Sequence, residues 1–398
     1  MQTVAILTMP AGVGKASSVS GQRIVVLDGL RGMATILVVI SHYFGEVPHG
    51  LRAVMLGWIA VDMFFVLSGF LIGKLILERR HHANFFMVFY VRRFCRILPA
   101  YLAMLVVTVA IMHCFPRAWM EAGQPFPLWS YLSFTQVFFM SGTQSLGTHW
   151  LAPTWTLAVE EHFYLLAPAL LVFTPRRWLV PALVPVAALA VLLRLVLCIS
   201  HSNPVAALVL LPARADILVC GMLAAVATRS PNLDWGSMMP ALRVVPVLAL
   251  GVVVALRLVQ GEHTWGILAP LLVAAGCATY MLGIIFGAPE AKRYHSKALQ
   301  FFGNNGLCIY LIHLPVLGLM HGVILRQAPD IATPAQWLVT LAAVPACVGV
   351  SFIMTKLIEE PIAAFGRSWR WSVRLREMPP LACGLRQAPY PAGVQAYL

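Results

Sequence analysis

Charged residues are scarce in this sequence of 398 residues: Asp, Glu, Lys and Arg together make up only 11% of it. Hydrophobic residues make up 60%, and the mean hydropathy is +0.81. One soluble core cannot bury so large an apolar excess, so much of it must face lipid. The scarcity of charge therefore argues against an ordinary soluble protein and indicates an integral membrane protein.

Cysteine pairs are also missing. The eight cysteines stand singly, without a Cys-x-x-Cys pair and without neighbours at the spacing of metal ligands. Most lie inside apolar stretches, where a free cysteine behaves as a small packing residue. We therefore expect neither a disulfide framework nor a metal site.

The sequence has no internal repeat and no polar stretch long enough for a separate soluble domain. Residues 1–22 lack the basic start of a signal peptide and are predicted to form a loose cytoplasmic lead-in. We expect one membrane domain over 23–367 and a cytoplasmic tail over 368–398.

Apolar stretches of about 20 residues, the length that crosses a bilayer as a helix, recur along nearly the whole chain. They predict an all-α, polytopic membrane helix bundle with about ten transmembrane helices in the lipid bilayer. The predicted spans are 27–45, 56–77, 97–115, 155–174, 178–199, 205–228, 244–260, 265–286, 303–325 and 335–357.

The formal net charge of +13 raises the alternative of a nucleic-acid-binding protein. Most of the 28 Lys and Arg, however, fall on segments that share one side of the membrane if the N-terminus is cytoplasmic. The positive-inside rule then places both termini in the cytoplasm. We expect no nucleic-acid partner, and a location in a bacterial-type inner (plasma) membrane.

Two ionisable residues share one face of the first span. Arg31 and His42 are eleven positions apart, which at 100° per residue returns to within about 20° of one helix face, roughly 16 Å further along. This spacing suits a long ligand held by its charged end at Arg31 and its reactive end at His42. Asp28 can pair with Arg31. The alternative is an interface anchor pair and a structural histidine.

Further charges lie in or beside the predicted spans, where each is a candidate functional group. Arg93 and Arg96 occupy adjacent turns at the predicted inner mouth, and either bind a phosphate or only enforce topology. Glu160 and Glu161 begin the fourth span on the outer side, with His162, and the apolar run after them favours a cavity-facing Glu160. Arg214 and Asp216 open the sixth span, where they either neutralise one another or contact a substrate.

Several segments, in a fixed order, resemble signatures of the acyltransferase family 3 membrane enzymes. The run LDGLRGMA at 27–34, followed by His42, resembles the opening Arg and His separated by ten residues. VDMFFVLSGFLI at 61–72 is similar to the second signature, and Arg93 with Arg96 to the paired-arginine motif. Thr156 stands where the family usually has Ser, and His162 where it has Gln. The remaining similar segments are Trp155–Tyr164, Arg214–Asp216, Phe302–His313 and Glu359–Pro361.

The resemblance implies transfer of an acyl group, commonly acetyl from acetyl-CoA, to a carbohydrate hydroxyl. Arg31, Arg93 and Arg96 would bind the phosphates of acyl-CoA. His42 would act as general base or as a transient acyl carrier, assisted by Glu160 and Glu359. No permanently bound cofactor is expected. The other candidates are Asp28, Asp62, Ser68, Trp155, Glu161, Arg214, Asp216, Asn304, Tyr310 and His313.

The expected acceptor is a surface polysaccharide, a lipid-linked glycan or a Nod-factor-like oligosaccharide, with a macrolide sugar as the alternative. A transporter, with Arg31, Glu160 and His313 along its path, is the rival from a different class. The sequence shows neither the paired halves nor the matching interrupted helices typical of transporters. A scaffolding protein would leave the shared face of Arg31 and His42 unexplained.

Overall fold

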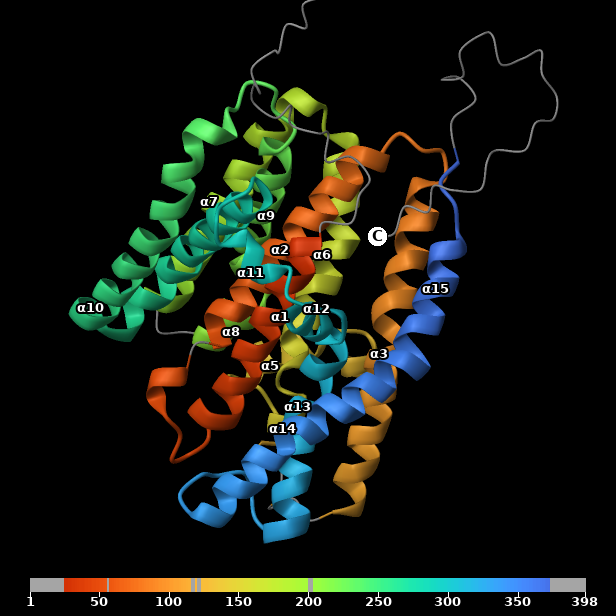
Figure 1. Ribbon diagram of the computed structural model, residues 1–398, viewed down its shortest axis with the longest axis vertical. Helices are drawn as coiled ribbons and strands as arrows, with labels where there is room; N and C mark the ends of the chain where they lie inside the picture. Colours follow the sequence, from red (N-terminus) through yellow and green to blue (C-terminus); the bar gives the residue numbers. More distant parts are fainter. Residues whose placement is uncertain (1–24, 56, 116–118, 120–122, 200–202, 373–398) are drawn as a thin grey trace, which may run out of the picture.

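A computed structural model describes residues 25–372, apart from 56, 116–118, 120–122 and 200–202. Within these residues the fold is helical, without a strand (Figure 1). Ten of its helices are long and apolar enough to cross a membrane. The predicted all-α, multi-pass bundle is thereby confirmed. The predicted lead-in 1–22 and residues 373–398 of the predicted tail lie outside the described residues.

The helices follow the predicted apolar stretches. In chain order they are α1 (Val25–Ile40), α2 (Gly57–Arg79), α3 (Phe85–Cys114), α4 (Leu128–Leu132), α5 (Gln136–Thr143), α6 (Thr154–Phe173), α7 (Leu179–Ile199), α8 (Pro204–Val209), α9 (Leu211–Ala227), α10 (Trp235–Ile285), α11 (Ala291–Tyr294), α12 (Lys297–Asn304), α13 (Gly306–Leu325), α14 (Pro334–Met354) and α15 (Glu360–Ser368).

The helix α10 holds two predicted spans. Its later half folds back along its earlier half: a Cβ on Gly276 would lie 3.3 Å from the Cβ of Ala249, and one on Gly283 3.5 Å from the Cβ of Leu242. The segments Trp235–Leu256 and Gly266–Ile285 therefore run antiparallel and count as separate spans. In Figure 1 they form a green and teal hairpin at one edge of the molecule.

Two spans differ from their predicted lengths. The helix α3 begins at Phe85, twelve residues before the predicted start at 97, and α14 continues through a π-helical turn and α15 to Ser368. The predicted spans stop at charged residues, because charge lowers the average hydropathy. In the structure these charged side chains face a cavity or another segment of the chain, so the helix continues past them. Arg92, for example, donates a hydrogen bond of 2.7 Å to the carbonyl oxygen of Trp369.

Glycines bring α1 and α12 into backbone contact. A Cβ on Gly32 would collide with the carbonyl group of Leu299, and one on Gly303 with the carbonyl group of Asp28. Small residues allow this close approach between helices in a membrane, where packing has to supply the association energy. The contact fixes the position of α1 relative to α12, which leads directly into α13.

Candidate functional site

Two adjoining cavities lie inside the helix bundle. The larger, of about 730 Å³, is lined by residues of α1, α3, α12 and the α14–α15 region. The smaller, of about 130 Å³, lies between α1, α2, α3, α6 and α13. Arg31, Arg93 and Arg96 line both cavities. Three guanidinium groups therefore mark the boundary between a wide cavity and a narrow chamber.

The paired arginines lie deeper than the sequence suggested. Because α3 begins at Phe85, Arg93 and Arg96 are eight and eleven residues into the helix, or about 12 and 17 Å from its start. The guanidinium of Arg93 lies 5.6 Å from the centre of the Tyr164 ring. No ion pair joins Arg93 or Arg96 to a carboxylate among the residues that the structure describes. Their charge can therefore serve an anionic ligand.

Arg31 has a partner on its own helix. Its Nη1 lies 3.5 Å from Oδ1 of Asp28, one turn earlier. Both side chains line the wide cavity, so the pair faces a cavity as well as the neighbouring helix.

Glu160 faces the narrow chamber and is held by two hydroxyl groups. The Ser68 hydroxyl donates a hydrogen bond of 2.5 Å to its Oε1, and the Tyr164 hydroxyl one of 3.3 Å to its Oε2. Glu160 thus shares a chamber with Arg93, although the sequence placed these residues at opposite ends of the membrane. Glu161 lines neither cavity, and His162 stacks against Phe138 with ring centres 5.9 Å apart.

Tyr310 connects the chamber to a histidine. Its side chain lines the chamber, and its hydroxyl lies 2.8 Å from Oγ1 of Thr156. Its carbonyl oxygen lies 2.7 Å from Nδ1 of His313, and the two rings are 5.7 Å apart. His313 is fully buried behind this chamber wall.

His42 lies beside His313 and lines neither cavity. Its Nδ1 is 3.2 Å from Nε2 of His313 and 3.0 Å from the carbonyl oxygen of Val38. Its Nε2 is 3.5 Å from Oε2 of Glu46. The shared face expected for Arg31 and His42 assumed a continuous α-helix, but α1 ends at Ile40 and a π-helical turn, Ser41–Gly45, carries His42. Such turns are frequent at functional sites.

A second π-helical turn, Thr355–Glu359, brings Glu359 to the wide cavity. The Cys308 thiol donates a hydrogen bond of 3.3 Å to its Oε2. Asn304 lines the same cavity, at the end of α12. Glu359 is therefore near the arginines, and no contact joins it to His42.

Sequence reasoning did not single out four charged residues of this region. Lys356, Glu360 and Arg367 line the wide cavity, and Glu46 contacts His42. Glu46 could have been found from its spacing, since it lies four residues after His42. Arg367 could not, because its place depends on the packing of α15 against α3.

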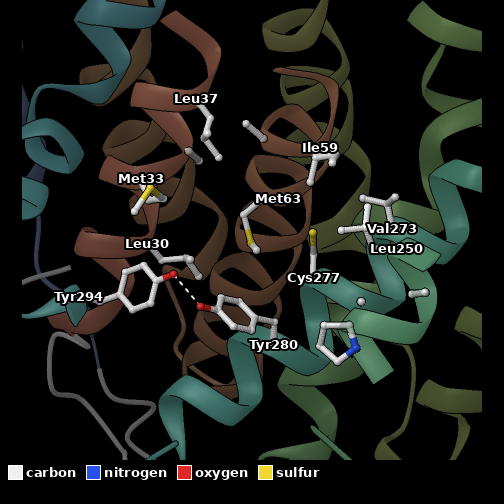
Figure 2. A pocket seen from close by; sticks show the side chains of 15 residues that line it. Leu30, Met33, Leu37, Ile59, Met63, Leu250, Val273, Cys277, Tyr280 and Tyr294 are labelled. Atoms are coloured by element: carbon white, nitrogen blue, oxygen red, sulfur yellow. Dashed lines mark hydrogen bonds between the residues drawn. The ribbon is translucent and has the colours of Figure 1, made fainter. Parts of the chain in front are cut away.

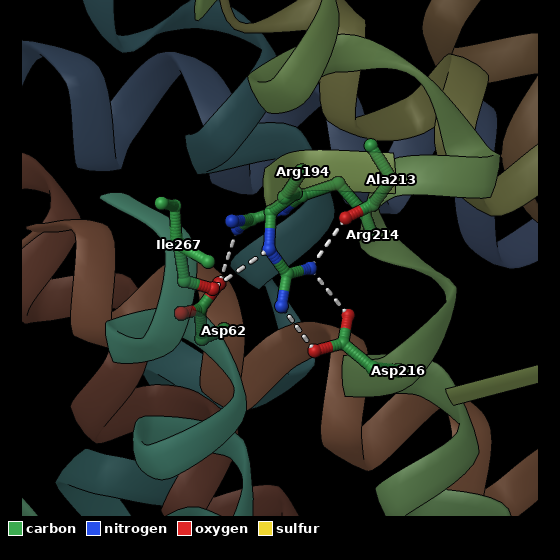
Figure 3. A network of polar contacts seen from close by, with 6 residues as sticks. All are labelled: Asp62, Arg194, Ala213, Arg214, Asp216 and Ile267. Carbon is green, nitrogen blue, oxygen red and sulfur yellow. Dashed lines mark hydrogen bonds and ion pairs between the residues drawn. The ribbon is translucent and has the colours of Figure 1, made fainter. Parts of the chain in front are cut away.

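Three candidate charges, Asp62, Arg214 and Asp216, form buried pairs that line neither cavity, one of them with Arg194 (Figure 3). The guanidinium of Arg194 binds Asp216 through two hydrogen bonds of 2.7 and 2.6 Å, and Arg214 binds Asp62. Arg214 and Asp216 therefore do not neutralise one another, because each has a partner on another helix. The Trp155 ring lies 5.8 Å from the Arg214 guanidinium. These residues tie α2, α6, α7 and α9 together.

A third cavity, of about 240 Å³, lies between α1, α2 and α10 (Figure 2). Its lining is apolar apart from the Cys277 thiol and the hydroxyls of Tyr280 and Tyr294, which lie 2.7 Å apart. No charged side chain is among the residues that line it.

Comparison with known proteins gives the family of the chain. The model of the acyltransferase domain family matches residues 24–356. The peptidoglycan O-acetyltransferase OatA of Listeria monocytogenes is 27% identical, over 85% of this chain and 56% of that protein. The putative peptidoglycan O-acetyltransferase YrhL of Bacillus subtilis is 25% identical, over 85% and 55%. The O-acetyltransferase OatA of Staphylococcus aureus is 24% identical, over 85% and 58%.

The chain spans little more than half the length of these relatives. No solved structure matches it. The family match covers nearly the whole helical bundle, the narrow chamber and the wide cavity except its lining from Glu359 to Arg367, in agreement with the family resemblance of the sequence. The chain therefore belongs to the acyltransferase domain family, as a multi-pass membrane member.

Proposed function

We propose that the chain is a membrane O-acyltransferase that moves an acyl group, in the simplest case acetyl, from acyl-CoA to a hydroxyl of a carbohydrate. The observation that carries this proposal is the meeting of Arg31, Arg93 and Arg96 between a wide polar cavity and a narrow chamber. Family membership supplies the reaction class, and the names of the relatives favour an acetyl donor and a glycan acceptor.

The wide cavity suits the nucleotide end of the donor. Its volume of about 730 Å³ falls within the range of small-molecule sites, about 300–1,000 Å³. Arg367 adds positive charge to the three arginines on its wall, whereas Lys356 is paired with Glu360 at 2.5 Å. Phosphate groups bind strongly to such clustered guanidinium groups. The pantetheine arm would then point through the narrow chamber toward Tyr310.

His42 and His313, which lie beyond Tyr310, suit the thioester end of the donor. His42 would accept the proton of the acceptor hydroxyl through Nε2 while that oxygen forms a bond to the acyl carbon. The carbon–sulfur bond of the thioester breaks, and the thiolate of CoA leaves. Direct transfer needs no covalent enzyme intermediate.

The distribution of Lys and Arg indicates which side of the protein faces the cytoplasm. We place both termini and the wide cavity in the cytoplasm of a bacterial-type inner membrane, because Lys and Arg gather on that side. The donor then binds from inside, and an acceptor glycan approaches from outside, near Glu46. An acceptor that approaches from outside is more readily peptidoglycan or another surface glycan than a macrolide sugar.

Mass spectrometry of cell-surface glycan tests the function. Cells that carry the gene should show O-acetyl groups that are absent from cells without it and from cells with His42→Ala protein at equal abundance. Identical acetylation in all three would contradict the proposal.

A further inference from the structure

We infer that Glu46 is a positioning residue, which together with His313 holds His42 in the tautomer and charge state that acyl transfer requires. This inference deepens the proposed function and rests on it, because it concerns the same histidine. The supporting observation is the row Glu46, His42 and His313, in which each side chain contacts the next.

The partners of the two rings assign their protons. Nδ1 of His313 lies 2.7 Å from the carbonyl oxygen of Tyr310, which can only accept, so this nitrogen carries a proton. Nε2 of His313 is then an acceptor for His42. Nδ1 of His42 faces that acceptor at 3.2 Å and the carbonyl oxygen of Val38 at 3.0 Å, so it carries a proton as well.

Among the described residues, Nδ1 of His42 has two acceptors within hydrogen-bond distance, whereas Nε2 has only the longer contact with Glu46, so Nε2 is the basic atom of the neutral ring. It is the atom that lies 3.5 Å from Oε2 of Glu46. A carboxylate at this distance stabilises the imidazolium that forms when Nε2 accepts a proton. Glu46 thus orients the ring and stabilises its charged form, while the histidine alone contacts the reacting groups.

Glu46 is itself oriented. The Ser41 hydroxyl donates a hydrogen bond of 3.0 Å to its Oε1, which directs Oε2 toward His42. The Glu46 side chain is 36% exposed, against 16% for His42. An acceptor hydroxyl arriving past Glu46 therefore meets the Nε2 side of the ring first.

One further contact keeps the histidines together. The Tyr43 hydroxyl donates a hydrogen bond of 2.8 Å to the carbonyl oxygen of His313, which joins the π-helical turn to α13. Charged or titratable groups on nearby elements include Arg52, in a turn packed against Ser41–Gly45, and His149 and Tyr310, near His313.

The experiment compares Glu46→Gln with Glu46→Asp and with Glu290→Gln in the full chain in lipid nanodiscs. Glutamine keeps the volume of Glu46 and an acceptor for Ser41 but removes the charge. Glu290, which pairs with Arg243 and lines neither the wide cavity nor the narrow chamber, serves as the matched control. The probes are acetyl-CoA as donor and a soluble N-acetylglucosamine tetrasaccharide as acceptor.

Glu46→Gln should lower kcat about tenfold, because the imidazolium that forms during transfer loses its neighbouring carboxylate. The KM for acetyl-CoA should stay unchanged. Glu46→Asp should recover part of kcat, and Glu290→Gln should match wild type.

A ¹⁵N-histidine NMR spectrum of the same proteins, recorded without any acceptor, reports which ring nitrogen of His42 carries the proton. Wild-type His42 should carry its neutral-form proton on Nδ1, and the chemical shift of its Nε2 should change in Glu46→Gln but not in Glu290→Gln. An unchanged Nε2 shift together with an unchanged kcat in Glu46→Gln would overturn the inference, even if His42→Ala is inactive. Full activity of His42→Ala would instead contradict the proposed role of His42 itself.

Discussion

The hydroxyl groups of Thr156 and Tyr310 lie 2.8 Å apart on the wall of the narrow chamber, joining α6 to α13. Each also lies within hydrogen-bond distance of the carbonyl oxygen of Pro153. The family signature that this segment resembles has Ser at the position of Thr156, so the resemblance implies that the hydroxyl is retained in this chain and only a methyl group is added.

Thr156→Ser should therefore keep acyl transfer near the wild-type rate, whereas Thr156→Val should lower it about two- to tenfold, the value of one hydrogen bond. The measurement is the initial rate of transfer at saturating acetyl-CoA by purified protein. Equal rates for the serine and valine variants would show that the shape of residue 156 matters and its hydroxyl does not.

The double variant Arg93→Ala and Arg96→Ala should bind acetyl-CoA more weakly and remain folded. Each charged hydrogen bond to phosphate is worth about 1.5–3 kcal/mol, or roughly 10- to 150-fold in affinity. Isothermal titration in nanodiscs measures the Kd. Arg177→Ala, which removes an exposed positive charge away from both cavities, is the control. An unchanged Kd in the double variant would reduce the two arginines to topology anchors.

His42→Ala should abolish transfer while acetyl-CoA still binds, because general-base catalysis supplies about 10²- to 10⁴-fold in rate. Arg31→Ala should mainly raise the apparent KM for the donor. His113→Ala is a close control: its Nδ1 also contacts a carbonyl oxygen four residues earlier, at 2.8 Å, but it is exposed on α3. The prediction fails if His42→Ala turns over at the wild-type rate with saturating donor.

Gly303→Ala should destabilise the protein, because its new Cβ would collide with the carbonyl group of Asp28. Overpacking of this kind costs about 1–3 kcal/mol. Gly349→Ala, whose Cβ would meet open space, should leave thermal unfolding in detergent at or above the wild-type temperature. Gly303 also lines both cavities, so its variant should bind acetyl-CoA more weakly as well. Matching unfolding temperatures for both variants would mean that α1 and α12 can move apart freely.

A single cysteine at position 82, in a cysteine-free background, should resist an impermeant thiol reagent in intact cells. One at position 145 should react. This follows from the excess of Lys and Arg on the side that carries position 82. The opposite labelling pattern would invert the proposed orientation and place the wide cavity outside.

The spans and the family could be recognised from the sequence. A bilayer demands about 20 apolar residues per crossing helix, so hydropathy along the chain reports each span nearly independently of the others. The ordered signatures likewise need no three-dimensional information. The prediction lost accuracy where charge enters a span, as at the start of α3, because a hydropathy average treats a cavity-facing arginine as if it faced lipid.

The partners of the charged residues could not be derived from the sequence. His42 meets His313, 271 positions away, and Arg214 pairs with Asp62, 152 positions away, rather than with its neighbour Asp216. Such pairs depend on how each helix is rotated and how closely it approaches the next. Glycine contacts such as Gly303 on Asp28 set that approach, and the π-helical turn at Ser41–Gly45 sets the direction of His42. The glycine contacts and the direction of His42 depend on neighbouring helices. A single segment of sequence does not contain the surface against which it packs, so neither feature could be predicted from it.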